Sequence, residues 1–296
     1  MPSESFSRLV AALRRARDEA PPRTDPVALR QNGESLALPP GDDVEVEQAV
    51  VASVPGEWVR VPGVRDDAAL VYMHGGGYVT GSTNTHRKLA GDLARASELP
   101  VFVADYPLAP ENPYPAAVDA MTGVCTAIFD RFGPERVVLG GDSAGGGLVV
   151  AVMLKLKAIS GSQPAAACCI SPWTDLTRTA PDPDLVAADP MVSPDGLDVM
   201  ARSYLGGADP TDPLVSPVRA HLEGLAPMLI QVGASEMLLD DSLDLARQAG
   251  KHNVEVTLEI SPHMIHVWHI FAGRLPEATQ AVERAARFFQ QHLPAQ

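Results

Sequence analysis

The sequence predicts an α/β protein with a mostly parallel sheet of eight strands and helices on its faces. Its 296 residues are enough for one large core. Short runs of β-branched and apolar residues alternate with longer amphipathic segments, which is typical of parallel sheets covered by helices. The first two runs leave no room for a helix between them, so an antiparallel edge is expected there.

Each expected element is bounded by a change in pattern. The strands are expected at Glu45–Ser53, Trp58–Val61, Ala68–Met73, Val101–Asp105, Arg136–Leu139, Ala166–Ile170, Met228–Val232 and Val254–Ile260. The helices are expected at about Asn84–Ser97, Ala116–Phe132, Gly145–Ile159, Asp241–Lys251 and Glu277–His292.

Two segments fall outside this alternation. Residues 1–44 contain a helical pattern of Phe6, Leu9, Val10 and Leu13, and residues from about 178 to 217 are rich in Pro and Asp. They could be a docked terminal helix and a surface connection. Long insertions in compact domains are more often functional, so we expect a cap segment at 1–44 and a cap insertion in a catalytic domain at 45–296.

The composition restricts the partners. A net charge of −14 and a pI near 4.9 disfavour nucleic acids and anionic lipid, and favour a small neutral substrate. Residues 1–13 lack the pattern of a secretory signal, and the apolar run Leu148–Leu154 is too short to span a membrane. Three cysteines without metal-ligand spacing suit a cytoplasmic protein with no metal or cofactor.

The pentapeptide Gly141-Asp142-Ser143-Ala144-Gly145 has the form G-x-S-x-G and lies between an expected strand and an expected helix. A sharp strand-to-helix turn exposes the central serine oxygen, and the flanking glycines allow strand and helix to approach closely. A phosphate-binding loop is the alternative, but no Gly-Lys-Ser/Thr follows. Ser143 is therefore the candidate nucleophile of an α/β-hydrolase fold.

A second glycine-rich segment, His74-Gly75-Gly76-Gly77, follows the expected strand Ala68–Met73. This is where esterases and lipases of that fold place backbone N–H groups for an oxyanion hole. The N–H groups of Gly76, Gly77 and Ala144 could stabilise a tetrahedral oxyanion. We expect His74 to hold the loop in shape rather than to act as a base.

The acid and the base should follow the last strands, in the order Ser, acid, His. After Met228–Val232 the candidates are Glu236, Asp240 and Asp241. Both aspartates lie at the start of a helical pattern, where carboxylates usually cap amide groups. Glu236 is therefore preferred, with Asp240 as the alternative.

Three histidines, His263, His266 and His269, follow the last expected strand. His263 lies directly after Pro262, and His269 lies in an apolar stretch that begins near Trp268. His266 stands at the junction and is the candidate general base.

Five motifs resemble those of the hormone-sensitive-lipase family of bacterial esterases. They are HGGGY at 74–78, YPLAPENPYPAA at 106–117, GDSAGG at 141–146, SPWTDLT at 171–177 and MIHVW at 264–268. The resemblance implies Ser143, Glu236 and His266 as the triad, the same oxyanion donors and a helical cap. It also implies short to medium acyl esters as substrates, no metal, and often a homodimer. Pro107 stands where the family often has Arg, and Glu236 where it commonly has Asp.

Other functions use the same motifs. An amide hydrolase, such as an aryl formamidase, would need better-timed protonation of a poorer leaving group. A non-catalytic receptor on this scaffold usually lacks a triad member, and a serine peptidase needs a gating domain or an extended cleft. Substrate preference depends on the cap, for which Trp173, Tyr204 and Leu205 are the candidate lining residues.

Overall fold

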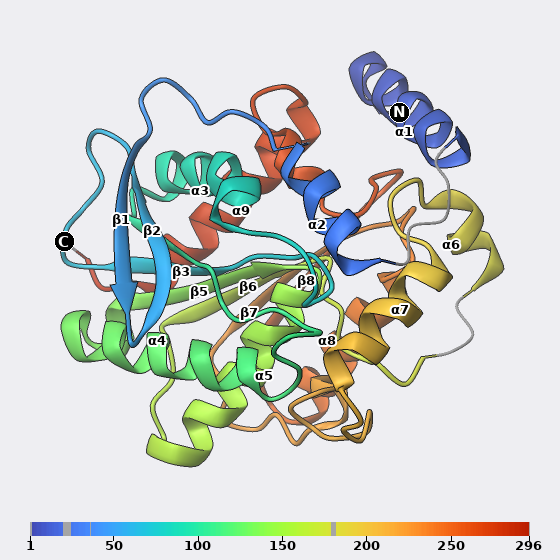
Figure 1. Cartoon of the computed structure of the whole chain (residues 1–296). Coiled ribbons are helices and arrows are strands. Elements are labelled where there is room, and N and C mark those ends of the chain that lie inside the picture. The colour runs from blue at the N-terminus through green and yellow to red at the C-terminus, as the bar shows by residue number, and fades with distance from the viewer. Residues whose placement is uncertain (1, 20–24, 36, 179–181, 296) are drawn as a thin grey trace.

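One sheet of eight strands forms the centre of the computed structural model, which describes residues 2–19, 25–35, 37–178 and 182–295 (Figure 1). The strand order is β1-β2-β4-β3-β5-β6-β7-β8. The first two strands pair antiparallel to each other, β2 also pairs antiparallel to β4, and the remaining pairs are parallel. The predicted α/β-hydrolase fold and its antiparallel edge are confirmed. The strands are β1 Glu45–Val51, β2 Val54–Arg60, β3 Ala69–Met73, β4 Val101–Ala104, β5 Val137–Asp142, β6 Ala166–Ile170, β7 Met228–Gly233 and β8 Val256–Ser261.

The main departures from the predicted strand bounds are at the first hairpin and at the end of the fifth strand. Ala52 and Ser53, expected at the end of the first strand, form the hairpin turn with φ values of 48° and 68°. The second strand begins at Val54 because it pairs with β1 along its whole length. The fifth strand continues through two glycines to Asp142, since β6 pairs with it that far. Pairing with neighbours thus lengthens strands that local composition marks only weakly.

Helices cover both faces of the sheet and create two cores. Below the sheet in Figure 1 lie α4 (Ala116–Phe132), α5 (Ala144–Ser160) and α8 (Leu239–Lys251), whose apolar side chains join one cluster. On the other face, α3 (Thr83–Ser97) and α9 (Pro276–His292) pack together over the second cluster. These five helices match the predicted ones within two residues at each end.

Four further helices belong to the two segments outside the alternation. They are α1 (Glu4–Glu19), α2 (Pro26–Ser35), α6 (Pro183–Ala188) and α7 (Pro194–Leu205). The pattern that begins at Phe6 is helical, as predicted, and buries Phe6 against the second core. The insertion contains α6 and α7; its Pro- and Asp-rich composition did not indicate helices, whereas the family resemblance implied a helical cap. Residues 1, 20–24, 36 and 179–181 of these segments lie outside the described residues.

The helix signals of α7 are present in the sequence. Ser193 caps its N-terminus by accepting a hydrogen bond from the Gly196 N–H, Pro194 occupies the first turn, and Gly206 ends it in the left-handed conformation. The high Pro and Asp content of the segment concealed this capping pattern. Among the described residues, no helix combines the length and the hydropathy needed to cross a membrane.

Candidate active site

Ser143 lies at the sharp turn between β5 and α5, with φ 54° and ψ −123°. This backbone conformation is unfavourable for a residue with a Cβ and is held by its surroundings. The Ser143 N–H donates to the Ile170 carbonyl at 2.8 Å, and the Ser143 carbonyl accepts from the Trp173 N–H at 2.9 Å. The turn is therefore fixed to the end of β6 through its own backbone.

The flanking glycines are required by close backbone contacts. A Cβ added to Gly145 would lie 2.0 Å from the Met73 carbonyl oxygen, and one added to Gly141 would lie 2.5 Å from the Gly145 carbonyl oxygen. Strand β3, strand β5 and helix α5 therefore approach more closely than any side chain would allow. This contact brings the segment after β3 beside the serine turn.

That segment contains the predicted donors. Gly76 and Gly77 have φ values of 111° and 62°, which only glycine adopts at low cost. The Gly76 carbonyl accepts from the N–H groups of Val79 and Thr80, so it points back into its own turn. The third predicted donor, Ala144, is the fully buried first residue of α5.

His74 is buried, and its contacts are structural. Its Nδ1 lies 2.7 Å from the Gly75 carbonyl oxygen, and its ring stacks on Tyr106 at 4.3 Å. Burial, followed by the positive charge of His86, lowers the pKa of His74 to about 3, so its ring is neutral. These contacts agree with a role in shaping the loop.

Glu236 and His266 meet in a buried pair on the loops after β7 and β8. His266 Nδ1 lies 3.2 Å from Glu236 Oε1, and Glu236 Oε2 accepts hydrogen bonds from Ser171 Oγ and the Gly233 N–H, both at 2.9 Å. Glu236 is fully buried and His266 is 6% exposed. Burial by itself lowers the pKa of His266, but the bond to Glu236 and nearby negative charges raise it above its ordinary value.

Ser143 and His266 are connected through the end of β6. Ser143 bonds to Ile170, and the next residue, Ser171, accepts a hydrogen bond at 3.2 Å from the N–H of Val267, the neighbour of His266. Both side chains belong to the described residues, and no direct hydrogen bond joins them.

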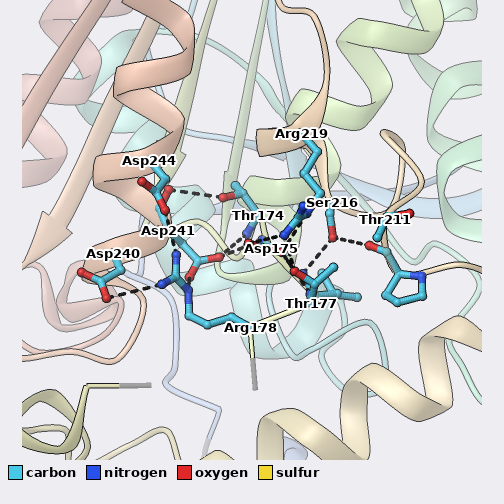
Figure 2. A network of polar contacts seen from close by, with 12 residues as sticks. Thr174, Asp175, Thr177, Arg178, Thr211, Ser216, Arg219, Asp240, Asp241 and Asp244 are labelled. Atoms are coloured by element: carbon cyan, nitrogen blue, oxygen red, sulfur yellow. Dashed lines mark hydrogen bonds and ion pairs between the residues drawn. The ribbon is translucent and has the colours of Figure 1, made fainter. Parts of the chain in front are cut away.

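Asp240 and Asp241 lie on α8 and bind other groups (Figure 2). Asp240 pairs with Arg178 at 3.5 Å. The expectation that the aspartates cap the helix is wrong: no side chain caps the start of α8, and Asp241 Oδ1 instead accepts the Thr174 and Asp175 N–H groups at 2.9 and 2.8 Å. The loop after β6 crosses the start of α8 and offers two backbone donors that the helix pattern could not reveal.

The other two candidate histidines have separate surroundings. His269 is buried in a short 3₁₀ turn, where its Nε2 lies 3.0 Å from Gln231 Oε1 and burial lowers its pKa to about 3. His263 is exposed and has a left-handed backbone, with φ 68°. Of the three, His266 is the histidine that bonds to a carboxylate.

Sequence reasoning missed Ser171 and Asp189. Ser171 stands at φ 46° after β6 and uses one hydroxyl group to join Glu236 to the Val267 N–H. Asp189 belongs to the cap insertion, is fully buried, and accepts at 2.9 Å from the N–H of Met237, next to Glu236. The SPWTDLT stretch could have drawn attention to Ser171, whereas only the fold brings Asp189 to this loop.

We predict that Ser171→Ala lowers kcat of ester hydrolysis about 10-fold. The loss of one hydrogen bond to the buried Glu236 carboxylate corresponds to about 1–3 kcal/mol, because the carboxylate keeps its other partners. Steady-state kinetics with a short-chain ester measure this effect. Ser160→Ala, which removes a hydroxyl at the end of α5, is the control, and an unchanged kcat in Ser171→Ala would contradict the prediction.

A cavity of about 130 Å³ lies between the loop after β6, the cap insertion and the start of α8, and Ser143, Glu236 and His266 do not line it. Trp173 lines it, together with residues of the cap insertion and of the segment after Glu236, whereas Tyr204 and Leu205 do not. Tyr204 is buried and stacks on Tyr78 at 3.8 Å, directly after the glycine loop. The cavity is lined by Trp173, Asp175, Leu176, Arg178, Pro194, Leu197, Asp198, Ala201, Met237, Leu238 and Asp241.

Comparisons with known proteins agree with this geometry. Residues 70–270 match a family described as having the alpha/beta hydrolase fold. An acetyl-hydrolase of Streptomyces hygroscopicus is 42% identical over 265 residues, which are 86% of this chain and 84% of the relative. An esterase of Acinetobacter venetianus is 35% identical over 268 residues, 89% of this chain and 88% of that esterase.

Solved structures extend the likeness over almost the whole chain. The esterase EstE5, in crystals soaked with p-nitrophenyl butyrate, has a TM-score of 0.92 and 43% identity, covering 98% of this chain and 99% of its own. An esterase from the bacterial hormone-sensitive lipase family has a TM-score of 0.93 and 39% identity, covering 99% and 100%. This chain therefore belongs to the alpha/beta-hydrolase fold family and, within it, to the hormone-sensitive-lipase group of carboxylic ester hydrolases.

Proposed function

We propose that the protein is a serine carboxylesterase in which Ser143, His266 and Glu236 form the catalytic triad. The observation that carries the assignment is the buried His266–Glu236 pair beside a serine held in a strained turn. Glu236 binds Nδ1 of the imidazole, which leaves Nε2 as the nitrogen that accepts a proton. No other carboxylate among the described residues bonds to His266.

The reaction then proceeds through an acyl-enzyme. His266 removes the Ser143 proton as the serine oxygen attacks the ester carbonyl, and the N–H groups of Gly76, Gly77 and Ala144 bind the resulting oxyanion. The imidazolium protonates the departing alcohol, which leaves the acyl group on Ser143. Water, deprotonated by His266, attacks the acyl group and releases the carboxylic acid.

The substrates we propose are neutral esters with short to medium acyl chains. The net charge of −14 disfavours anionic substrates. The relative named acetyl-hydrolase and the neighbour soaked with p-nitrophenyl butyrate indicate the same range.

Hydrolysis of p-nitrophenyl esters of increasing acyl length tests this function. We expect the highest kcat/KM among short chains, a burst of nitrophenol equal to the enzyme concentration, and a sulfonyl fluoride adduct on Ser143 detected by peptide mass spectrometry. Matched anilides measure amide hydrolysis, and faster turnover of the anilides would favour the amidase alternative. An enzyme that is inert on every ester would refute the proposal.

The pH dependence of kcat/KM follows from the protonation of His266, the proposed general base. The neutral form of His266 accepts the proton, so kcat/KM should fall as pH decreases through its pKa. The bond to Glu236 raises this pKa above the ordinary value, so we expect the acid limb to lie above about pH 6.5. Glu236→Gln removes the stabilising charge and should move the limb to lower pH. A limb below about pH 6 in the wild type would contradict the prediction.

The domain division, location and assembly belong to the same proposal. Residues 1–44 and 178–217 are the proposed cap. In support, Arg17 of α1 donates to the Asp189 carbonyl of the insertion at 2.9 Å, and Arg30 of α2 attaches the N-terminal segment to the catalytic domain through the carbonyls of Val79 and Ala109. We further propose a cytoplasmic homodimer. Cell fractionation and light scattering after size-exclusion chromatography test these two points, and a monomeric mass would exclude the dimer.

A further inference from the structure

A second buried histidine–carboxylate pair lies behind the glycine loop. Asp142 directly precedes Ser143 at the end of β5, and His86 lies in the first turns of α3. His86 Nε2 is 3.3 Å from Asp142 Oδ1 and 3.4 Å from Oδ2, and the two residues are 9% and 3% exposed. None of the proton transfers described above uses this pair.

The Asp142 carboxylate holds the glycine loop directly. Its Oδ1 accepts the Gly75 N–H at 3.1 Å and the Tyr72 hydroxyl at 2.8 Å. A Cβ on Gly75 would lie only 2.2 Å from Asp142 Oδ2, so the loop backbone packs against the carboxylate. Asp142, directly before Ser143, thus binds Gly75, which directly precedes the oxyanion donors Gly76 and Gly77.

The hydrogen bonds of Thr85 indicate how many protons the His86 ring carries. The Thr85 hydroxyl lies 2.9 Å from the Ser82 carbonyl oxygen and 2.8 Å from His86 Nδ1; when its single hydrogen bonds to the carbonyl, a protonated Nδ1 donates to the Thr85 oxygen. On the other side of the ring, a lone pair on Nε2 would face the Asp142 carboxylate, so Nε2 also carries a hydrogen. The Gly75 N–H lies 3.1 Å from Asp142 Oδ1 and 3.3 Å from His86 Nε2, and a protonated Nε2 leaves the carboxylate as its acceptor.

The groups around His86 favour its positive charge. Burial alone lowers its pKa, but the negative charge of Asp142 and the hydrogen bond to it raise the pKa above the ordinary value, with a smaller contribution from Glu34 on α2. His74 faces the ring at 5.3 Å and is neutral, because burial lowers its pKa to about 3. Tyr72, at 6.3 Å, keeps its proton because burial raises its pKa.

We propose that His86 is a positioning residue: as an imidazolium, it neutralises the buried Asp142 carboxylate and so fixes Gly75, and with it the oxyanion donors, beside Ser143. Without this charge, Asp142 would be a buried anion, for which protonation or movement is favourable. Either change weakens its bond to the Gly75 N–H. The proposal rests on the esterase function proposed above, because it assigns those donors to the oxyanion.

Replacing His86 with Gln tests the proposal in activity. Gln keeps a donor but cannot be charged, so we expect kcat to fall about 10- to 100-fold, less than the loss of a whole oxyanion donor, with KM nearly unchanged.

The wild type should lose activity at alkaline pH as His86 deprotonates, and His86→Gln should lack this loss. Thr85→Val removes the Nδ1 acceptor and should move the loss to lower pH. His221→Gln, at an exposed histidine paired with Glu223, is the matched control and should match the wild type.

A second readout does not need activity. A histidine whose pKa is raised in the folded state stabilises the fold at low pH and loses this contribution as pH rises through that pKa. The unfolding free energy of the wild type relative to His86→Gln should therefore decrease as pH rises above about 6.5, the ordinary pKa of histidine. A difference that stays constant over this range overturns the proposal, whatever the kinetics. A wild type inert on esters would instead refute the proposed function and leave this stability test valid.

Discussion

Replacing Ser143 with Ala will lower kcat/KM for a short-chain p-nitrophenyl ester by about 10⁵- to 10⁶-fold, because no acyl-enzyme can form. Ala keeps the Cβ, and the turn is held by the backbone bonds to Ile170 and Trp173, so the unfolding free energy should be nearly unchanged. Steady-state kinetics with the purified, folded variant measure the loss of kcat/KM, and chemical denaturation measures the unfolding free energy. Activity near that of the wild type would exclude Ser143 as the nucleophile.

The same assay separates Glu236 from Asp240. Glu236→Gln keeps the shape but replaces the acceptor that orients His266 Nδ1–H, so a loss of about 10⁴-fold in kcat is expected. Asp240→Asn is the matched control: its side chain is 40% exposed and contacts Arg178 at 3.5 Å, so kcat should stay within about twofold of the wild type. Equal losses in the two variants would contradict the assignment of Glu236.

The sequence was sufficient for the parts of the fold that depend on local pattern. Both ends of β6 and of α4 were predicted correctly. Strand β6 is apolar throughout, and α4 ends at Phe132, directly before the capping residue Gly133. The preference for Glu236 also came from local pattern, since the loop after β7 offered one carboxylate that was not in the helix α8. Because β7 and β8 are parallel neighbours, the loop with Glu236 and the loop with His266 leave the sheet at the same edge.

What the sequence could not provide are contacts between distant segments. Asp189 lies 48 positions from Met237 and reaches its N–H only because the insertion folds over the loop of Glu236. Asp241 was expected to cap its own helix, but the loop after β6 presents two free N–H groups to it. Likewise, the ring of Tyr204 stacks on that of Tyr78, 126 positions earlier in the chain, a contact that no local pattern indicated. Tertiary partners decide such roles, and no local pattern encodes them.

Arg178 should matter for stability, because in the network of Figure 2 it is the cation that faces the buried Asp241. Its Nε lies 3.3 Å from Asp241 Oδ2, without a hydrogen-bonding angle, and its Nη2 lies 2.9 Å from Asp244 Oδ2. Burial raises the pKa of Asp241 to about 6, and the Thr174 N–H and Arg178 limit the rise. The fold therefore gains stability from Asp241 at low pH and loses it as pH increases through about 6.

Arg178→Met should reduce the unfolding free energy by about 2–4 kcal/mol at about pH 8, because Asp241 then becomes an uncompensated buried anion. At about pH 5 the Asp241 carboxyl is mostly protonated in both proteins, so the difference should shrink to the lost packing of the guanidinium stem. Arg247→Met, which removes an exposed partner of Asp244, is the control, with an effect below about 1 kcal/mol at both pH values. Denaturant unfolding at the two pH values measures these changes. If the loss in Arg178→Met were independent of pH, Asp241 would not be the group that Arg178 compensates, and the attachment of the cap insertion to α8 would rest on Asp240 and Asp244 instead.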